Sequence, residues 1–400
     1  MSSGSPGSDP HRATIEVYER RAAEWETERT ARVDEAQAFT DRLRRDPDVP
    51  PGAVVDLGCG PGWHLPALPE GTIAVDAAGA MLELVPEHRA GAPRVAADLR
   101  ALPFRRHSLR AAWVNKSYVH LDRRLTPLAL WDLHRSLSVG GLAYLGVFAA
   151  SRPEAGPEAP ESGRAPTGGP SESSGSGVDL AEWEGDDFAG RSFSHWTPAL
   201  LDTVIAGAGF SVLERVERPE SEQVTFVGVT LRRERTLADT VGPGMRLLLV
   251  GLNPSEYAAD VGVGFARPGN RAWPALLASG LASTDRDPVA LLRSGRVGMS
   301  DLVKRATPRA DQLHRDEFAS GLERLDRLCE WLRPGAVCIL GVTGWRQATG
   351  DRAAVPGPQE QRLGGRPVHV APNPSGLNAH TSVDDLVDHL HAALALAVRA

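Results

Sequence analysis

The chain has 400 residues, more than one hydrophobic core normally organises, so its length favours two domains. Hydrophobic residues make up 42% and charged residues 24%, and no apolar run approaches the roughly 18 residues of a membrane helix. Three widely spaced cysteines cannot build a disulfide framework or a four-thiolate metal site, and the polar N-terminal sequence lacks the apolar stretch of a signal peptide. These features exclude membrane-spanning and disulfide-rich secreted proteins, and we expect a cytoplasmic protein.

The net charge of −7 is unevenly distributed along the chain. Residues 1–235 hold 26 Lys and Arg against 34 Asp and Glu, whereas residues 236–400 hold 18 against 17. Neither half is basic enough to indicate nucleic-acid binding from its charge alone.

The first part of the chain alternates strand-like and helix-like patterns. Apolar runs typical of buried strands cover 53–58, 72–77, 109–114 and 142–149, and a helical pattern covers 125–137. Such alternation is typical of a parallel sheet covered by helices on both faces.

Residues 151–178 are rich in Pro, Gly, Ser and Glu, and we expect this segment to be disordered because it cannot bury enough apolar surface. A helical pattern follows over 197–210, with strand-like runs over 211–217 and 223–233. These elements supply the helix and hairpin that the preceding unit lacks. We therefore predict that 151–178 is an insertion within one α/β domain, residues 1–235.

From Met245 the alternation starts again, which predicts a second α/β domain over residues 236–400. We see no internal repeat, so the predicted architecture is two tandem three-layer α/β domains. The expected strands are 246–253, 295–303, 336–341 and 366–372, and the expected helices are 270–281, 317–333 and 383–398.

A glycine-rich motif, VVDLGCGPG over 54–62, covers the end of the first strand and the loop after it. Glycines at a strand end let a ligand approach the backbone. The dinucleotide fingerprint would need glycine where Trp63 stands, and no Gly-Lys-Ser/Thr is found next to the loop, so NAD and a phosphate loop are both disfavoured. Asp76, at the end of the second strand, is placed to accept ribose hydroxyls, and Asp98 or the next amide could reach an adenine edge.

VVDLGCGPG, AVDAAGAML, ADLRALPF and SVGGLAYLGVF together resemble the class I S-adenosylmethionine-dependent methyltransferases. The resemblance covers 50–149 and 190–233 and implies a Rossmann-like fold that binds S-adenosylmethionine and no metal. The alternative is that the glycines only shape a turn while Asp56 caps a helix. The residues that the resemblance assigns to the cofactor are Asp56, Gly58, Gly60, Gly62, Asp76, Asp98, Leu99 and Asn115.

The methyl acceptor stays open. The loop over 114–120, VNKSYVH, lacks the Asp/Asn-Pro-Pro-Tyr motif of base-amino DNA methyltransferases, and no cysteine follows a proline as in cytosine-C5 enzymes. The loop resembles those of small-molecule methyltransferases. His120 is either a general base or simply a packed or exposed histidine.

Two Asn-Pro-Ser turns in the second half follow strands, in GLNPS over 251–255 and APNPSGLN over 371–378. Such turns project polar side chains over the carboxyl end of a parallel sheet, where open α/β sheets bind ligands. With GFARPGNR over 264–271 and DLVKRAT over 301–307, they resemble the mismatch-specific uracil/thymine-DNA glycosylases of the uracil-DNA glycosylase superfamily. The resemblance covers about 240–395. Ser255 and Asn378 depart from the usual pattern, which puts the fine substrate preference in doubt.

The resemblance implies a monomeric enzyme that flips a base out of double-stranded DNA at a G·U or related mispair. It assigns catalysis to Asn253, which would position a water, and to Asn373. Without a lysine nucleophile near these motifs other than Lys304, strand cleavage is not expected. The remaining roles are stacking on the base by Phe265, reading of its edge by Ser300 and Asp301, and wedging or DNA binding by Gly376, Leu377, Asn378, Arg271 and Lys304.

Simpler interpretations are that both asparagines are turn residues, that Phe265 and Leu377 pack in the interior, and that Arg267, Arg271, Lys304 and Arg305 are surface charges. The favoured function is a DNA repair glycosylase fused to a methyltransferase domain. One alternative is a small-molecule methyltransferase whose glycosylase-like domain serves only for DNA binding. Another is a methyltransferase-like half that binds cofactor or a partner without catalysis.

Overall fold

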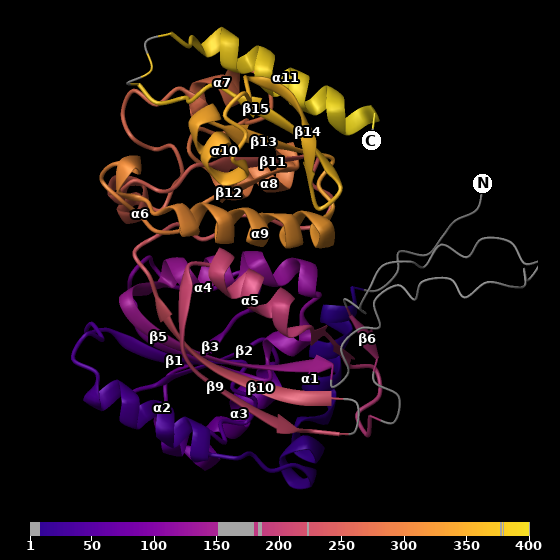
Figure 1. The fold of residues 1–400 in the computed structure, drawn as a ribbon. Helices are drawn as coiled ribbons and strands as arrows, with labels where there is room; N and C mark the ends of the chain where they lie inside the picture. Colours follow the sequence, from indigo (N-terminus) through magenta and orange to yellow (C-terminus); the bar gives the residue numbers. More distant parts are fainter. Residues whose placement is uncertain are drawn as a thin grey trace, which may run out of the picture.

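The described residues form two large β-sheets, one of eight strands and one of five, each packed against helices (Figure 1). This confirms the predicted fold class. Among the described residues, no helix is long and apolar enough to cross a membrane. The computed structural model describes residues 9–150, 180–182, 186–221, 224–376, 378 and 380–399.

The eight-stranded sheet has the order β3-β2-β1-β4-β5-β10-β9, with β8 beside the end of β5. Strands β3, β2, β1, β4 and β5 are parallel, and β10 and β9 are antiparallel additions at one edge. The strands are β1 Ala53–Leu57, β2 Ile73–Asp76, β3 Arg94–Ala96, β4 Leu109–Asn115, β5 Leu137–Ala150, β8 His195–Trp196, β9 Phe210–Pro219 and β10 Val224–Arg233, while β6 Ala181–Glu182 and β7 Ser192–Phe193 form a small separate ribbon.

Strands from both sides of 151–178 join this sheet, since β5 pairs with β10 from Ala150↔Val224 to Leu142↔Arg232. The segment 151–178 itself lies outside the described residues, so its disorder and the domain limits 1–235 and 236–400 stay predictions. Between β8 and β9, Thr197 caps helix α5 by accepting a hydrogen bond from the Leu200 amide, with Pro198 at the first position. The helices of this half are α1 Pro10–Glu28, α2 Asp34–Arg45, α3 Gly79–His88, α4 Thr126–Ser136 and α5 Pro198–Gly207, with 3₁₀ turns at Leu65–Ala67, Tyr118–His120 and Arg123–Leu125.

The five-stranded sheet has the order β12-β11-β13-β15-β14. Its first four strands are parallel and fully buried over most of their length, and β14 is an antiparallel edge strand. Its elements are β11 Leu247–Gly251, α6 Glu256–Val261, α7 Ala272–Ala278, α8 Pro288–Gly295, β12 Val297–Asp301, the 3₁₀ turn Ala310–Gln312, α9 Arg315–Leu332, β13 Ala336–Leu340, α10 Val342–Thr349, β14 Gly357–Leu363, β15 Arg366–Ala371 and α11 Val383–Arg399.

Helices α4 and α5 lie between the first sheet and α9 of the second half (Figure 1). Trp196 and Trp331 meet across this boundary with ring centroids 6.1 Å apart. The Asp239 amide donates to the Gly207 carbonyl at 2.8 Å. The two halves therefore share a packed interface that includes main-chain hydrogen bonding.

Candidate functional sites

A cavity of about 750 Å³ opens at the carboxyl ends of β1, β2 and β4. This is the size range of ligand and cofactor sites. It is lined by five of the eight residues that the sequence assigned to the cofactor, namely Gly58, Gly60, Asp76, Leu99 and Asn115.

The glycine-rich loop after β1 is shaped by residues with positive φ. Gly58 has φ +72°, and an added Cβ would lie 2.3 Å from the Cβ of Ser117. Gly60 has φ +54° and open space beside its Cα, which is where a ligand can approach the main chain. Gly62, with φ +98°, faces Leu65 instead and does not line the cavity. The first two glycines therefore face the cavity, whereas the third closes the turn behind it.

Asp76 anchors this loop from the end of β2. Its carboxylate accepts hydrogen bonds from the amides of Gly60 and Ala78, both at 2.9 Å. Burial raises the pKa of Asp76 in spite of these hydrogen bonds. Asp56 is only 1% exposed and does not line the cavity, and burial and then Asp76 raise the pKa of Asp56 well above its usual value.

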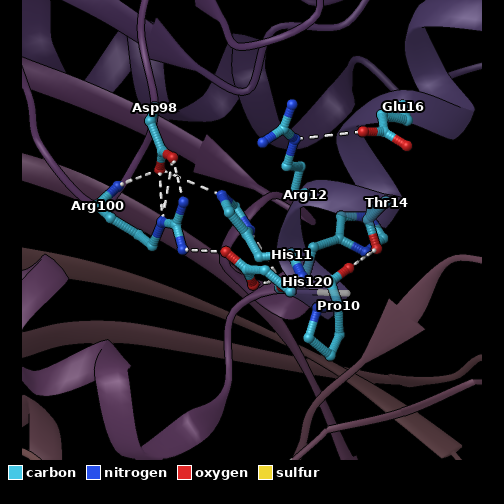
Figure 2. Close-up of polar contacts among 9 residues, drawn as sticks. Pro10, His11, Arg12, Thr14, Glu16, Asp98, Arg100 and His120 are labelled. Atoms are coloured by element: carbon cyan, nitrogen blue, oxygen red, sulfur yellow. Dashed lines mark hydrogen bonds and ion pairs between the residues drawn. The ribbon is translucent and has the colours of Figure 1, made fainter. Parts of the chain in front are cut away.

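Asp98 holds the start of α1 against the loop after β3 (Figure 2). Its carboxylate accepts from His11 Nε2 at 3.1 Å and from the Arg100 amide at 2.8 Å, and Arg100 also donates to Asp9 at 2.8 Å. Burial alone would raise the pKa of Asp98, but the hydrogen bonds from His11 and Arg100 lower it. The Asp98 carboxylate is thus hydrogen-bonded to other residues of the protein. Leu99 is the residue of this loop that lines the cavity.

Helix α1 forms a wall of the cavity that the sequence analysis did not identify. His11, Tyr18 and Trp25 all line it and are spaced seven residues apart, which places His11 and Tyr18 on one face of the helix, and Trp25 follows a kink at Arg21. Trp25 also stacks on Trp63, with ring centroids 6.0 Å apart. That spacing is the signal from which this wall could have been predicted.

The residues present suit S-adenosylmethionine. Two buried polar atoms of residues that line the cavity, Asn115 Oδ1 and Ser117 Oγ, have no hydrogen-bond partner among the described residues. Buried polar atoms are normally paired, so these atoms suit a ligand rich in donors. The ammonium and ribose hydroxyl groups of S-adenosylmethionine are such donors.

In the second half, Asn253 lies two residues beyond the end of β11, and its side chain is held in one orientation. Its Nδ2 donates to Thr307 Oγ1 at 2.8 Å and to the Arg305 carbonyl at 3.0 Å. Thr307 is 3% exposed and donates in turn to the Arg309 carbonyl. Oδ1 of Asn253 accepts no hydrogen bond from the part of the chain that the structure describes, so it is free to accept one from a water. The sequence analysis assigned no role to Thr307.

Phe265 and Asp301 converge on Gly251 at the end of β11. A Cβ at Gly251 would lie 2.4 Å from Asp301 Oδ1 and 3.1 Å from Phe265 Cζ, so only glycine fits between them. Phe265 has φ +59°, an uncommon conformation for an aromatic residue. Burial raises the pKa of Asp301 to about 6. Both side chains line a small void of about 20 Å³.

Ser300 and Lys304 belong to a buried charge network centred on Asp239. Asp239 accepts from Ser300 Oγ, Lys304 Nζ and Arg324, each at 2.7 Å. Burial alone would raise the pKa of Asp239, but Arg324 and Lys304 lower it. The structure thus places the Ser300 hydroxyl and the Lys304 ammonium in internal contacts, whereas the sequence assigned them to a base edge and to DNA.

The second Asn-Pro-Ser turn is tied to the loop that precedes α7. Asn373 Oδ1 accepts from the Ser375 amide at 2.9 Å, which is the simpler interpretation of a turn residue. Arg271 NH1 donates to the carbonyls of Ser375 and Asn378, and Asn378 Nδ2 donates to the Asn373 carbonyl. Arg271 therefore clamps the turn from within the protein.

Within the same turn, a Cβ at Gly376 would lie 2.8 Å from the Gly269 carbonyl, so the two loops touch there. Leu377, the predicted wedge, lies outside the described residues.

Comparison with known families agrees with both sites. Residues 238–395 match the family model of the uracil DNA glycosylase superfamily, and residues 54–141 match the model of a methyltransferase domain. These matches confirm the predicted resemblances at the level of the uracil DNA glycosylase superfamily and of a methyltransferase domain. The chain therefore contains a methyltransferase domain followed by a domain of the uracil DNA glycosylase superfamily.

Solved structures similar to this chain include the 1,6-didemethyltoxoflavin-N1-methyltransferase of Burkholderia thailandensis, 18% identical, covering 58% of this chain and 93% of that one, with a TM-score of 0.40. The magnesium protoporphyrin IX methyltransferase of Synechocystis is 13% identical, covering 58% and 100%, with a TM-score of 0.38. An S-adenosylmethionine-dependent methyltransferase of Mesorhizobium loti is 16% identical, covering 50% and 100%, with a TM-score of 0.34. Such low scores carry no argument about activity.

Proposed function

We propose that the second half is a DNA glycosylase that excises uracil, or a related mispaired base, opposite guanine, and that the first half transfers a methyl group from S-adenosylmethionine. The glycosylase acts on double-stranded DNA by flipping the base and directing a water to the sugar carbon, without cleaving the strand. A slow hydrolase is expected, because a neutral amide activates water more weakly than a carboxylate does.

The fixed orientation of Asn253 is the observation that carries this proposal. Three acceptors, the carbonyls of Pro254 and Arg305 and Thr307 Oγ1, hold its Nδ2, and Oδ1 accepts no hydrogen bond from the described residues. A side chain that only closed a turn would not need the contacts to Arg305 and Thr307. The arrangement supports positioning of a water for attack, and it favours catalysis over simple tethering to DNA.

The surroundings of Asn253 support binding of a planar base. Phe265 offers an aromatic face, and the carboxyl group of Asp301 lies next to it. A carboxyl group with a pKa of about 6 is partly protonated near neutral pH, so it can both donate to a carbonyl and accept from an N–H of a base. A uracil edge offers both kinds of group.

Asn253→Ala tests the glycosylase. With a G·U duplex and detection of abasic sites, the variant should excise uracil at least about 10²-fold more slowly than the wild type, the scale of removing a positioned catalytic group. Duplex affinity should change little. Gln359→Ala is the matched control, because that amide on edge strand β14 donates only to nearby carbonyls and should leave excision unchanged. Near-wild-type excision by Asn253→Ala would refute the assignment.

The first half is tested by titrating the full chain with S-adenosylmethionine and with NAD in a calorimeter. Binding of the first and not the second is expected, because Gly58 and Gly60 form an open cradle and Trp63 occupies the position of the third dinucleotide glycine. Absence of heat and of thermal stabilisation with S-adenosylmethionine, in folded protein, would remove the methyltransferase proposal and leave the glycosylase proposal untouched.

A further inference from the structure

Tyr18 and His120 form a hydrogen-bonded pair in the wall of the large cavity. The Tyr18 hydroxyl lies 2.9 Å from His120 Nε2, and both residues line the cavity. Tyr18 comes from α1 and His120 from the turn after β4, so the fold brings them together across 102 residues. This pair supplies the partner for His120 that the sequence did not show.

The hydrogen bonds define the protonation state of the pair. His120 Nδ1 lies 2.9 Å from the Ser192 carbonyl, which accepts only, so Nδ1 carries the proton. Nε2 is then an acceptor and receives the Tyr18 O–H. Burial lowers the pKa of His120 to about 4, so the ring is neutral at neutral pH and Nε2 is unprotonated.

Arg191 completes the arrangement. Its NH1 donates to the Tyr18 oxygen at 2.8 Å, and its guanidinium is paired with Asp186. Burial raises the pKa of Tyr18 and Arg191 lowers it, the net effect being a raised pKa. The phenol oxygen thus donates to His120 and accepts from Arg191, and no other donor among the described residues reaches it.

We propose that Tyr18 and His120 form the proton acceptor for methyl transfer, and that the methyl acceptor is a small aromatic molecule with an acidic hydroxyl group. The inference rests on the proposed function of the first half. The acceptor oxygen attacks the methyl carbon, the carbon–sulfur bond breaks with its electron pair going to sulfur, and S-adenosylhomocysteine leaves. The acceptor proton passes to the Tyr18 oxygen as the Tyr18 proton passes to His120, which becomes an imidazolium.

The lining of the cavity points to an aromatic acceptor. Besides Tyr18 and His120 it presents the rings of Trp25, Trp63, Phe148 and Phe193. Aromatic rings prefer stacked or edge-to-face contacts with other rings, so a planar aromatic molecule gains most from such walls. A hydroxyl group is inferred because the Tyr18 oxygen can accept one more hydrogen bond, and a hydroxyl group of the ligand can donate it.

Several other charged groups face the pair. His11 Nδ1 lies 3.4 Å from the His120 carbonyl, which can only accept, and His11 Nε2 lies against Asp98 (Figure 2). Asp186 and Asp76 act on the pair through space, the first through its contact with Arg191. The single cation in direct contact with Tyr18 among the described residues is Arg191. It favours negative charge on the phenol oxygen while the proton moves.

The test uses 4-nitrophenol, whose absorbance reports its ionisation, with the full chain and S-adenosylhomocysteine. At a pH where the free probe is mostly protonated, the wild type should bind it as the phenolate, with its apparent pKa lowered by at least one unit. Tyr18→Phe and His120→Gln should each abolish that shift. Tyr144→Phe and His134→Gln are matched controls that should keep it, since both are buried away from the cavity.

Circular dichroism and thermal unfolding show whether the variants fold. If His120→Gln does not fold, Tyr18→Phe still tests the pair, because it keeps the aromatic ring and removes only the hydroxyl group. Lack of probe binding by the wild type, or an unchanged shift in Tyr18→Phe, would overturn the inference. Labelled methyl groups should pass from S-adenosylmethionine to the probe; transfer to a DNA duplex instead would also overturn it. Calorimetry with S-adenosylhomocysteine separates these outcomes from failure of the cofactor proposal. Binding of S-adenosylhomocysteine does not depend on Tyr18 or His120 as proton acceptors.

Discussion

Asp301→Asn should stabilise the protein at neutral and alkaline pH, although most substitutions of buried residues destabilise. Asp301 ends β12, and burial, followed by repulsion from Asp239, raises its pKa from the usual 3.8 to about 6 in spite of the attraction of Lys304. A shift of about 2 units corresponds to roughly 3 kcal/mol at 1.36 kcal/mol per unit. This is the free energy that the folded protein loses by holding the carboxylate ionised.

The sign of the pH dependence is set by proton binding. Between pH 3.8 and about 6 the folded protein binds more protons at this residue than the unfolded chain does, so the free energy of unfolding falls as the pH rises through that window. Below it the penalty is absent, and above it the penalty is complete. Asparagine resembles the protonated acid in shape and carries no charge at any pH, so its advantage should grow through the window and be complete above it.

Urea unfolding of the full chain at pH 4.5 and pH 8 measures the effect. The gain of the variant over the wild type should be roughly 1 kcal/mol at pH 4.5, which lies inside the window, and up to about 3 kcal/mol at pH 8. Asp285→Asn is the control, because that exposed carboxylate pairs only with Arg286 beside it and should give no pH-dependent gain. Equal gains at both pH values, or destabilisation at pH 8, would refute the reasoning.

Three further predictions concern the other polar contacts. Asp76→Ala removes the carboxylate expected to accept two charge-assisted hydrogen bonds from ribose hydroxyls, each worth roughly 1.5–3 kcal/mol. The affinity for S-adenosylmethionine measured by calorimetry should therefore fall at least tenfold, and an unchanged affinity would contradict this. Thr307→Val keeps the shape of the side chain but removes one of the three acceptors of Asn253 Nδ2, so single-turnover excision should slow while duplex affinity holds; loss of both to the same extent would indicate unfolding. Asp239→Asn leaves Arg324 and Lys304 buried without their anion and should cost about 3–5 kcal/mol in urea unfolding, a prediction that fails if the midpoint does not move.

The fold was predictable where the elements bury a regular apolar pattern. Strands such as Ala53–Leu57 and Ala336–Leu340 appear in the sequence as continuous apolar runs, because helices cover both faces of a parallel sheet. Strand β14, Gly357–Leu363, was missed since its sequence GPQEQRL has one buried apolar residue and pairs only at the sheet edge. Helix α1 was missed because its many charged residues hide the face that lines the cavity.

The sites were predictable as motifs but not as sets of contacts. The positions of Gly58, Gly60 and Asp76 at the cavity depend on a local strand and loop, which a motif records. The pairing of Lys304 with Asp239 spans 65 residues, and that of Tyr18 with His120 spans 102. Such contacts depend on how separate elements pack together, and no spacing in the sequence encodes them.

The interface between the halves places the methyltransferase domain against the side of the second domain that carries Phe265 and Asp301. Trp131 of α4 lines the same void as Phe265 and Asp301, and the Arg106 guanidinium lies against Gly262, three residues before Phe265. Asp239 bonds to Gly207 through its main chain and to Ser300 through its side chain. A shift of α4 or α5 would therefore reach Phe265, Asp301 and Ser300 through direct contacts, so the packing between the halves extends to the residues proposed to bind a base.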